Sequence, residues 1–190
     1  MTKEAIVLGI FLGLLMAWKK KRFLSRPRFK KLIIAGTGAV LFIISLKMAP
    51  SVPFVARYFS VLHWLFLFVM AVGCLFGGHF GYILIGSGLL LNGLVVALNG
   101  YMPVEVSALL KTGDSSALTL ISEGRAITHG LANEGTRLRF LCDRFAYSSA
   151  ITSARVVSLG DGIIAIGLFL FVASAVTYLF GKVDRHEMDK

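Results

Sequence analysis

Apolar residues in this chain are concentrated in five long runs, which are separated by short polar stretches and by one long one. The runs cover residues 5–18, 32–49, 55–76, 82–98 and 159–180. A helix needs about 20 mostly apolar residues to cross a membrane, and all but the first run approach or reach that length. The first run can be extended toward its N-terminus, and Trp18 at its end is typical of a membrane interface. The pattern therefore predicts an all-α integral membrane protein, a bundle of five transmembrane helices.

The polar stretch between the first two runs is strongly basic and contains no acidic residue. Its basic residues are Lys19, Lys20, Lys21, Arg22, Arg26, Arg28, Lys30 and Lys31. Basic residues keep short loops in the cytoplasm, so we expect the N-terminus outside and, after five crossings, the tail 181–190 inside. The long polar segment 99–157 then lies on the extracytoplasmic side. This topology divides the chain into a four-helix membrane part (1–98), the outer segment, a fifth helix (158–180) and the tail.

The outer segment contains signals for two short helices. Pro103 is suited to the first position of a helix over 103–111. Asp114 or Ser115 can cap a second helix over 117–121. Both helices would have apolar faces, so we expect them to lie on the membrane surface or to cover the helix ends as a lid.

Composition agrees with a membrane protein, because 56% of the residues are hydrophobic and only 16% are charged. The basic loop supplies eight charges of the formal net charge of +10, so we expect no nucleic-acid partner. Cys74 and Cys142 lack a redox or metal spacing and imply no disulfide framework. Phosphate-binding loops, a Gly-x-Ser-x-Gly elbow and recognised metal-binding spacings do not occur in the sequence, so we expect no cofactor and no metal.

Two asparagines share one face of the fourth predicted helix. Asn92 and Asn99 are seven residues apart, which is two helical turns. An amide at membrane depth needs a partner, so we expect Asn92 to bond to a neighbouring helix, with a ligand contact as the alternative. Asn99 and Gly100, followed by Pro103, are typical of a helix C-terminus. This stop places Asn99 at the outer boundary of the membrane.

Acidic residues and one histidine near the fifth run could carry chemistry. Ser158 and Asp161 fit a capping box, while an inward-facing Asp161 would be suited to proton transfer. Asp143 supplies a second carboxylate, which either pairs with a nearby arginine or shares a proton with Asp161. His129 belongs to no recognised metal spacing, and we expect it to be solvated or hydrogen-bonded.

Several short stretches between Leu91 and Gly167 match, in the same order, those of one bacterial family. They are Leu91-Asn92, Leu98-Asn99-Gly100, Met102-Pro103-Val104, His129, Thr136-Arg137-Leu138, Phe140-Leu141, Asp143, Ser158-Leu159-Gly160-Asp161, Ile164, Ala165 and Gly167. By these residues the chain resembles domain-of-unknown-function family 5317, which implies a small bacterial membrane protein with several helices. It departs from that family at Tyr101, where a Gly-Arg pair is usual, at Arg139, where proline is common, and at Cys142, where glycine is common.

The start of the fifth run is also similar to the last motif of lipoprotein signal peptidase. In that enzyme an aspartate opens the final helix, and Ile and Gly follow at the offsets of Ile164 and Gly167. The enzyme also uses an asparagine and an earlier aspartate, and two helices separate these two residues. The helix order differs here, because Asn99 and Asp143 share one outer segment. The likeness is an analogy that suggests aspartyl chemistry.

The leading prediction is a non-catalytic binding or accessory component, a multi-pass protein of the bacterial cytoplasmic membrane. We expect a polar pocket at the outer membrane boundary that binds a lipid-like or small ligand, or a membrane protein partner. The predicted lining residues are Asn92, Asn99, His129, Arg137, Asp143 and Asp161. In this hypothesis Asn99 orients the ligand, Arg137 meets an anionic group, and the acids set the shape and charge of the pocket.

The alternative prediction is an aspartyl-type membrane peptidase or hydrolase. Asp143 and Asp161 would then be an acid and base pair that activates one water. This mechanism needs the two carboxyls close together, with neither of them consumed by an arginine or a helix cap. A transporter ranks third, because only Asn92 and Lys47 lie near a path across the membrane.

Overall fold

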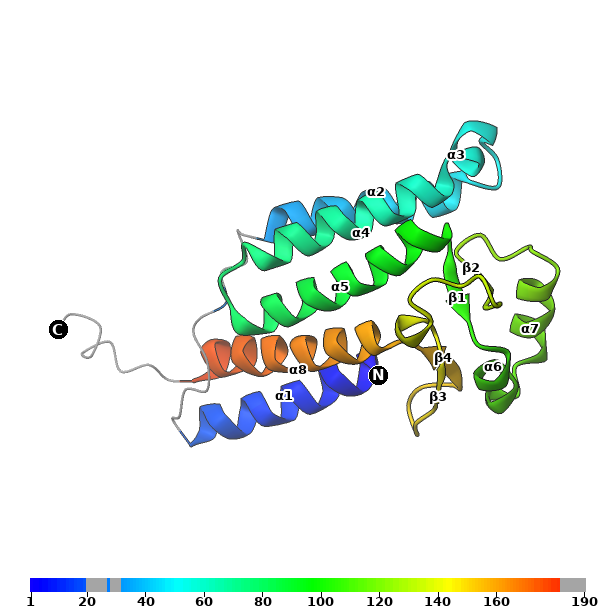
Figure 1. Cartoon of the computed structure of the whole chain (residues 1–190). Coiled ribbons are helices and arrows are strands. Elements are labelled where there is room, and N and C mark those ends of the chain that lie inside the picture. Colours follow the sequence, from blue (N-terminus) through cyan, green and yellow to red (C-terminus); the bar gives the residue numbers. More distant parts are fainter. Residues whose placement is uncertain (20–26, 28–31, 182–190) are drawn as a thin grey trace.

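The computed structural model describes residues 1–19, 27 and 32–181 of the chain. The basic residues from Lys20 to Lys31 and the tail from Lys182, on which the predicted orientation depends, lie outside the described residues. The described residues form a bundle of long helices with a smaller mixed region at one end of it (Figure 1).

The bundle consists of five long helices, which confirms the helical class predicted from the apolar runs. They are α1 (Thr2–Trp18), α2 (Ile33–Met48), α4 (Phe59–Leu75), α5 (Phe80–Asn99) and α8 (Leu159–Phe180). They pack in a row in the order α2, α4, α5, α8 and α1 (Figure 1). Among the described helices, α5 and α8 are long and apolar enough to cross a membrane by length and composition, while α2 and α4 are shorter apolar helices.

The sequence predicts one helix over the third apolar run, residues 55–76, but the structure has two helices there. A short helix, α3 (Pro53–Arg57), comes first, and α4 begins after Tyr58. Pro53 occupies the first turn of α3, where its missing N–H costs nothing, and it therefore starts a helix earlier than the apolar pattern predicts.

Glycines let α5 and α8 approach closely. A Cβ atom added at Gly88 would lie 2.5 Å from the carbonyl oxygen of Gly160, and one added at Gly81 would lie 2.7 Å from that of Gly167. Larger side chains at these positions would separate the two helices. The close approach sets the positions from which α5 and α8 contribute to the site described below.

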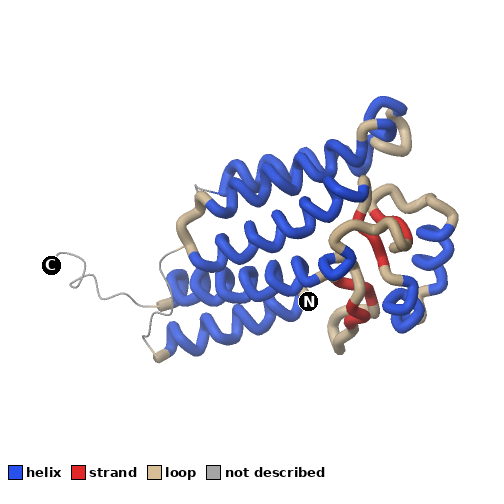
Figure 2. The backbone as a smooth tube through the Cα atoms, in the orientation of Figure 1, coloured by secondary structure: helices blue, strands red, loops and turns tan. Residues whose placement is uncertain are grey.

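The region at the end of the bundle, residues 100–157, is here named the cap. It contains helices α6 (Val106–Thr112) and α7 (Ser115–Ser122) and a short 3-10 helix, η2 (Arg139–Leu141). It also contains two small sheets, which the apolar pattern did not predict: β1 (Met102–Val104) pairs in parallel with β2 (His129–Leu131), and β3 (Phe145–Tyr147) pairs antiparallel with β4 (Arg155–Val157). Figure 2 shows these strands between the bundle and the cap helices α6 and α7.

Pro103 does not open a helix, which corrects the prediction for residues 103–111. It lies in β1, where its carbonyl accepts a hydrogen bond from the backbone of Asp143 at 3.0 Å, and α6 begins only at Val106. Proline is compatible with a short strand because its ring only removes one donor from the ladder. The predicted cap of the second helix is confirmed, since the Asp114 carboxylate accepts from the backbone N–H of Ala117 at 2.9 Å.

The helix stop predicted after the fourth run is confirmed. Gly100 follows α5 with a φ of 81°, in the left-handed region that favours glycine.

The N-terminal helix α1 contacts the cap. The side chain of Ser149 in the cap donates a hydrogen bond to the carboxylate of Glu4 in α1. The N-terminal end of α1 therefore lies at the same end of the bundle as the cap (Figure 1).

Candidate functional site

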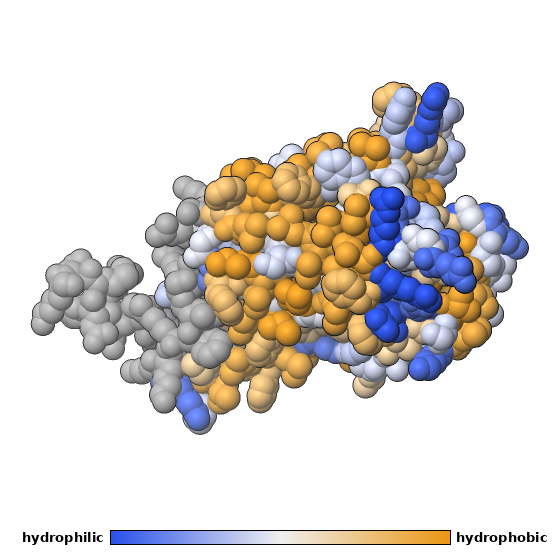
Figure 3. All heavy atoms as spheres, in the orientation of Figure 1, coloured by the Kyte–Doolittle hydropathy of each residue, from blue (hydrophilic) through white to orange (hydrophobic). Residues whose placement is uncertain are grey.

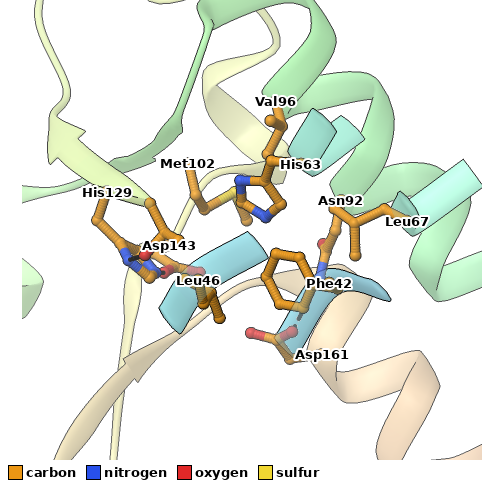
Figure 4. Close-up of a pocket in the computed structure, with 11 residues that line it drawn as sticks. Phe42, Leu46, His63, Leu67, Asn92, Val96, Met102, His129, Asp143 and Asp161 are labelled. Atoms are coloured by element: carbon orange, nitrogen blue, oxygen red, sulfur yellow. Dashed lines mark hydrogen bonds and ion pairs between the residues drawn. The ribbon is translucent and has the colours of Figure 1, made fainter. Parts of the chain in front are cut away.

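A cavity of about 300 Å³ lies where the bundle meets the cap. Its polar lining residues are His63, Asn92, Thr128, His129, Asp143 and Asp161, and its apolar ones are Phe42, Leu46, Leu67, Val96 and Met102. They come from α2, α4, α5 and α8 and from the cap. Figure 4 shows how these side chains converge. Four of the predicted site residues thus lie in one cavity: Asn92, His129, Asp143 and Asp161.

The polar wall formed by α5 and α8 is built on a capping box, as the sequence predicts. The hydroxyl of Ser158 accepts from the backbone N–H of Asp161 at 3.0 Å, and Oδ2 of Asp161 accepts from the backbone N–H of Ser158 at 3.0 Å. Nδ2 of Asn92 donates to Oδ1 of Asp161 at 2.9 Å, so the expected bond between Asn92 and a neighbouring helix is confirmed. Both carboxylate oxygens of Asp161 therefore have a donor.

The cap contributes His129 and Asp143 from the two segments that flank β1. His129 is paired with Met102 in the parallel sheet, and Asp143 forms a bridge with Val104 on the other side. This arrangement places Nε2 of His129 3.5 Å from Oδ2 of Asp143. Nδ1 of His129 lies 2.6 Å from the hydroxyl of Thr128, so the prediction of a hydrogen-bonded His129 is confirmed.

Asp143 is the most unusual group of the cavity. It is only 5% exposed, and its Oδ1 atom is buried without a hydrogen-bond partner among the described residues. Burial raises the pKa of the Asp143 carboxyl, the contact with His129 lowers it, and the charge of Asp161 raises it again. A buried carboxylate oxygen without a donor is unfavourable, so a donor group that reached Oδ1 would be bound strongly.

The remaining lining residue with a titratable side chain is His63, which the sequence-based site did not include. His63 is 7% exposed, and its ring is stacked on that of Phe42 with the centroids 5.1 Å apart. Phe59 packs on the same ring at 5.9 Å. The available signal was the single histidine of the third apolar run, near the outer end of that run.

Asn99 and Arg137 were also predicted to line the pocket, but they are not among its lining residues. Asn99 instead ties the end of α5 to the cap: its Nδ2 donates to the carbonyl of Arg137 at 3.0 Å, and its Oδ1 accepts from the backbone N–H of Arg137 at 2.9 Å. Neither lysine nor arginine lines this cavity among the described residues. The expected contact between Arg137 and an anionic group therefore has no basis in the cavity geometry.

Arginines of the cap have partners other than Asp143. Arg139 donates to Glu105 through Nε at 2.5 Å and Nη2 at 2.8 Å, and this hydrogen bonding lowers the pKa of Glu105. The guanidinium of Arg144 lies 5.8 Å from the centre of the Phe145 ring. Within residues 1–19, 27 and 32–181, no ion pair joins Asp143 to an arginine, so that predicted pairing is wrong and His129 takes its place.

The described part of the chain has no cluster of metal-binding side chains and no exposed cysteine. No group of three or more His, Cys, Asp or Glu side chains in that part is placed to hold a metal ion. Cys74 and Cys142 are both free and buried. Burial raises the pKa of the Cys142 thiol to about 11, which leaves it protonated and a poor nucleophile at neutral pH.

Comparison with known proteins identifies one family. A search of curated proteins and a search of solved structures each gave no match. The family model described as "Family of unknown function (DUF5317)" matches residues 26–173, which is well over half of the chain and includes every residue that lines the cavity. On that match, the chain belongs to the DUF5317 family.

Proposed function

We propose that this protein is a multi-pass membrane protein that binds a small amphipathic ligand in the cavity between the bundle and the cap. It would act as a binding or accessory component, without catalysing a reaction. The observation that carries the proposal is the buried Oδ1 atom of Asp143, an acceptor for which the described part of the chain supplies no donor. It belongs to a cavity with one polar and one apolar side. Convergent polar groups in a largely apolar cavity are typical of ligand sites.

The surface of the molecule supports a membrane location. Hydrophobic residues cover the visible face of the bundle, while hydrophilic residues gather over the cap (Figure 3). Exposed apolar side chains on α2 include Ile33, Ile34, Val40, Leu41, Ile43 and Ile44. An apolar surface of this extent favours contact with hydrocarbon over contact with water.

The arrangement of the helix ends supports the predicted topology. The basic segment begins at Lys19, directly after α1, and Leu32 before α2 follows its last residue. The ends of α1 and α2 that flank this segment point away from the cap (Figure 1). The cap and these two helix ends therefore lie at opposite ends of the bundle. If the basic segment is cytoplasmic, as its charge predicts, the cap and the cavity are extracytoplasmic.

Copurification tests the binding proposal. The full-length protein is extracted from membranes in a mild detergent, and the lipids, small molecules and proteins that remain bound are identified by mass spectrometry. We expect one bound species in near-stoichiometric amount with the wild type and a loss of it with Asp143→Asn. The matched control is Glu123→Gln, which removes an exposed carboxylate of the cap that pairs with Arg125, away from the cavity.

The copurification result has a clear opposite. A set of bound species that is identical for the wild type, Asp143→Asn and Glu123→Gln would contradict a binding role for the cavity. A stoichiometric protein partner that survives both substitutions would instead favour an accessory role through another surface.

A second candidate function, an aspartyl membrane hydrolase, is favoured by one observation. Asp143 and Asp161 line the same cavity, and the charge of Asp161 contributes to the raised pKa of Asp143. A proton retained by one of two neighbouring carboxyls is the arrangement that aspartyl hydrolysis requires. Against it, both oxygens of Asp161 accept hydrogen bonds within the capping box and from Asn92, so this carboxylate is already occupied by a structural role.

The hydrolase candidate has its own test. Peptides and lipids are profiled by mass spectrometry in cells that produce the wild type, Asp143→Asn or Asp161→Asn. A cleavage product that depends on both carboxylates would favour the hydrolase. Identical profiles, together with ligand loss in Asp143→Asn, would favour the binding protein.

A further inference from the structure

The charge around the cavity is one-sided. Two carboxylates line it, and no lysine or arginine does so in the described part of the chain. The groups that face Asp143 or lie across the cavity from it are His129 from β2, Asp161 from α8, Asn92 from α5 and His63 from α4. A cation between the two carboxylates would be attracted by both, whereas an anion would be repelled.

The two carboxylates differ in what they can still accept. Asp161 already accepts from Asn92 and from the backbone of Ser158. Oδ2 of Asp143 lies 3.5 Å from Nε2 of His129, while Oδ1 is buried and has no donor among the described residues. A group that binds at Oδ1 must donate a hydrogen bond, and an ionised donor bonds to a carboxylate more strongly than a neutral one.

The side of the cavity formed by α2 is apolar. Phe42 and Leu46 of that helix are half-buried and line the cavity, and Leu67 and Val96 continue the apolar wall (Figure 4). Because α2 lies at one end of the row, much of its remaining surface is exposed and apolar. A ligand whose head reaches Asp143 therefore has a hydrocarbon-like surface for its remaining atoms.

We propose that the cavity binds the protonated amine head of an amphiphile, with the ammonium group at the carboxylate of Asp143 and the alkyl portion along Phe42 and Leu46. This inference rests on the proposed function, because it names the ligand class for the same cavity. An aminophospholipid head group and a free alkylamine share this chemistry.

Three probes of equal chain length test the ligand class. Hexylammonium, hexanol and hexanoate are titrated into the purified full-length protein by isothermal calorimetry. We expect hexylammonium to bind most tightly and hexanoate most weakly. Asp143→Asn should weaken hexylammonium binding by about tenfold or more, the effect of losing one hydrogen bond between charged groups, while Glu123→Gln leaves it unchanged.

A second variant separates a loss of the site from a loss of the fold. Leu46→Trp fills the apolar side of the cavity without touching a carboxylate, and it should block all three probes while the melting temperature stays close to that of the wild type. Tighter binding of hexanoate than of hexylammonium, or hexylammonium binding that is unchanged in Asp143→Asn, would overturn the inference. If another probe binds in place of hexylammonium and Leu46→Trp blocks it, the cavity is still a binding site and only the ligand class is wrong. If no probe binds and nothing copurifies, the binding function and the ligand class both fail.

Reconstitution distinguishes the two sources of the amine. The protein is placed in vesicles of phosphatidylethanolamine and phosphatidylglycerol, released in mild detergent and examined by native mass spectrometry. Selective retention of phosphatidylethanolamine by the wild type, and its loss in Asp143→Asn, would assign the site to a lipid head group. Equal retention of both lipids alongside tight hexylammonium binding would assign it to a free amine, whereas selective retention of phosphatidylglycerol would overturn the inference.

Discussion

At the scale of single residues, Asp143 combines deep burial with an incompletely hydrogen-bonded carboxylate. It is almost completely buried, and one of its oxygens has no donor among the described residues. A residue that served only the stability of the fold would be expected to have its polar atoms paired. The unpaired oxygen therefore favours a role in binding, at some expense of stability.

The first prediction concerns the stability of Asp143→Asn. In the absence of ligand at pH 7, this substitution should increase the free energy of unfolding by about 1–3 kcal/mol, because it removes a buried charge that is poorly compensated. The measurement is the melting temperature of the purified protein in detergent, beside the Glu123→Gln control. A variant that melts well below the wild type would show instead that the Asp143 carboxylate stabilises the fold.

The second prediction is the pH dependence of that difference. Burial raises the pKa of Asp143 in the folded protein, so the folded state binds this proton more tightly than the unfolded state does. The stabilising contribution of the protonated carboxyl is present at low pH and is lost as the pH rises through the raised pKa. The melting temperatures of the wild type and Asp143→Asn should thus converge as the pH falls through that pKa and separate above it. A difference between the two melting temperatures that stays constant with pH would contradict titration of Asp143.

At the scale of helices and strands, the polar wall depends on the close approach of α5 and α8. A Cβ atom at Gly160 would collide with the side-chain amide of Asn92, which bonds to Asp161. By contrast, a Cβ at Gly162, two residues further along α8, would meet only Met1 at an ordinary distance of 3.7 Å. The two glycines form a matched pair for a test.

The third prediction compares these two glycines. Gly160→Ala should lower the free energy of unfolding by about 1–3 kcal/mol, because the added methyl group overpacks a tight helix contact. Gly162→Ala should be neutral or stabilising by up to about 1 kcal/mol, because alanine favours a helix. Melting temperatures of both variants check this. Equal effects of the two substitutions would mean that the contact between α8 and Asn92 does not limit the packing.

At this scale, the features that could be predicted from the sequence are those that depend on residues close together in the chain. The capping box of Ser158 and Asp161 and the stop at Gly100 depend on neighbouring residues, and both are confirmed. The sheet of β1 and β2 was missed, because three-residue strands have no detectable period and Pro103 is equally typical of a helix start. The contact between His129 and Asp143 follows from that sheet, so it could not be predicted without it.

The same limit explains the composition of the site. Asn99 has the residue type of a pocket lining, yet its amide is consumed by backbone groups at the junction with the cap. His63 lines the cavity because α4 packs beside α5, which is a matter of tertiary packing that a single apolar run does not reveal. Pocket membership depends on such contacts, and residue type alone does not determine it.

At the scale of the whole molecule, the row of helices and the cap form one arrangement in which the site lies at a boundary. On the face shown in Figure 3, hydrophobic residues cover the bundle and hydrophilic residues gather over the cap. The cavity lies between them, so a ligand there can place its head in the cap and its alkyl portion beside α2. The proposed role for the protein requires that this boundary coincide with the outer face of the membrane.

The fourth prediction is therefore the accessibility of the cap in intact cells. Glu134→Cys places a thiol at an exposed turn of the cap, and Lys19→Cys places one at an exposed position at the opposite end of the bundle. The wild type, whose two cysteines are buried, supplies the background. With a maleimide that cannot cross membranes, we predict labelling of Glu134→Cys in intact cells and labelling of Lys19→Cys only after permeabilisation. Labelling in the reverse order would contradict the extracytoplasmic site.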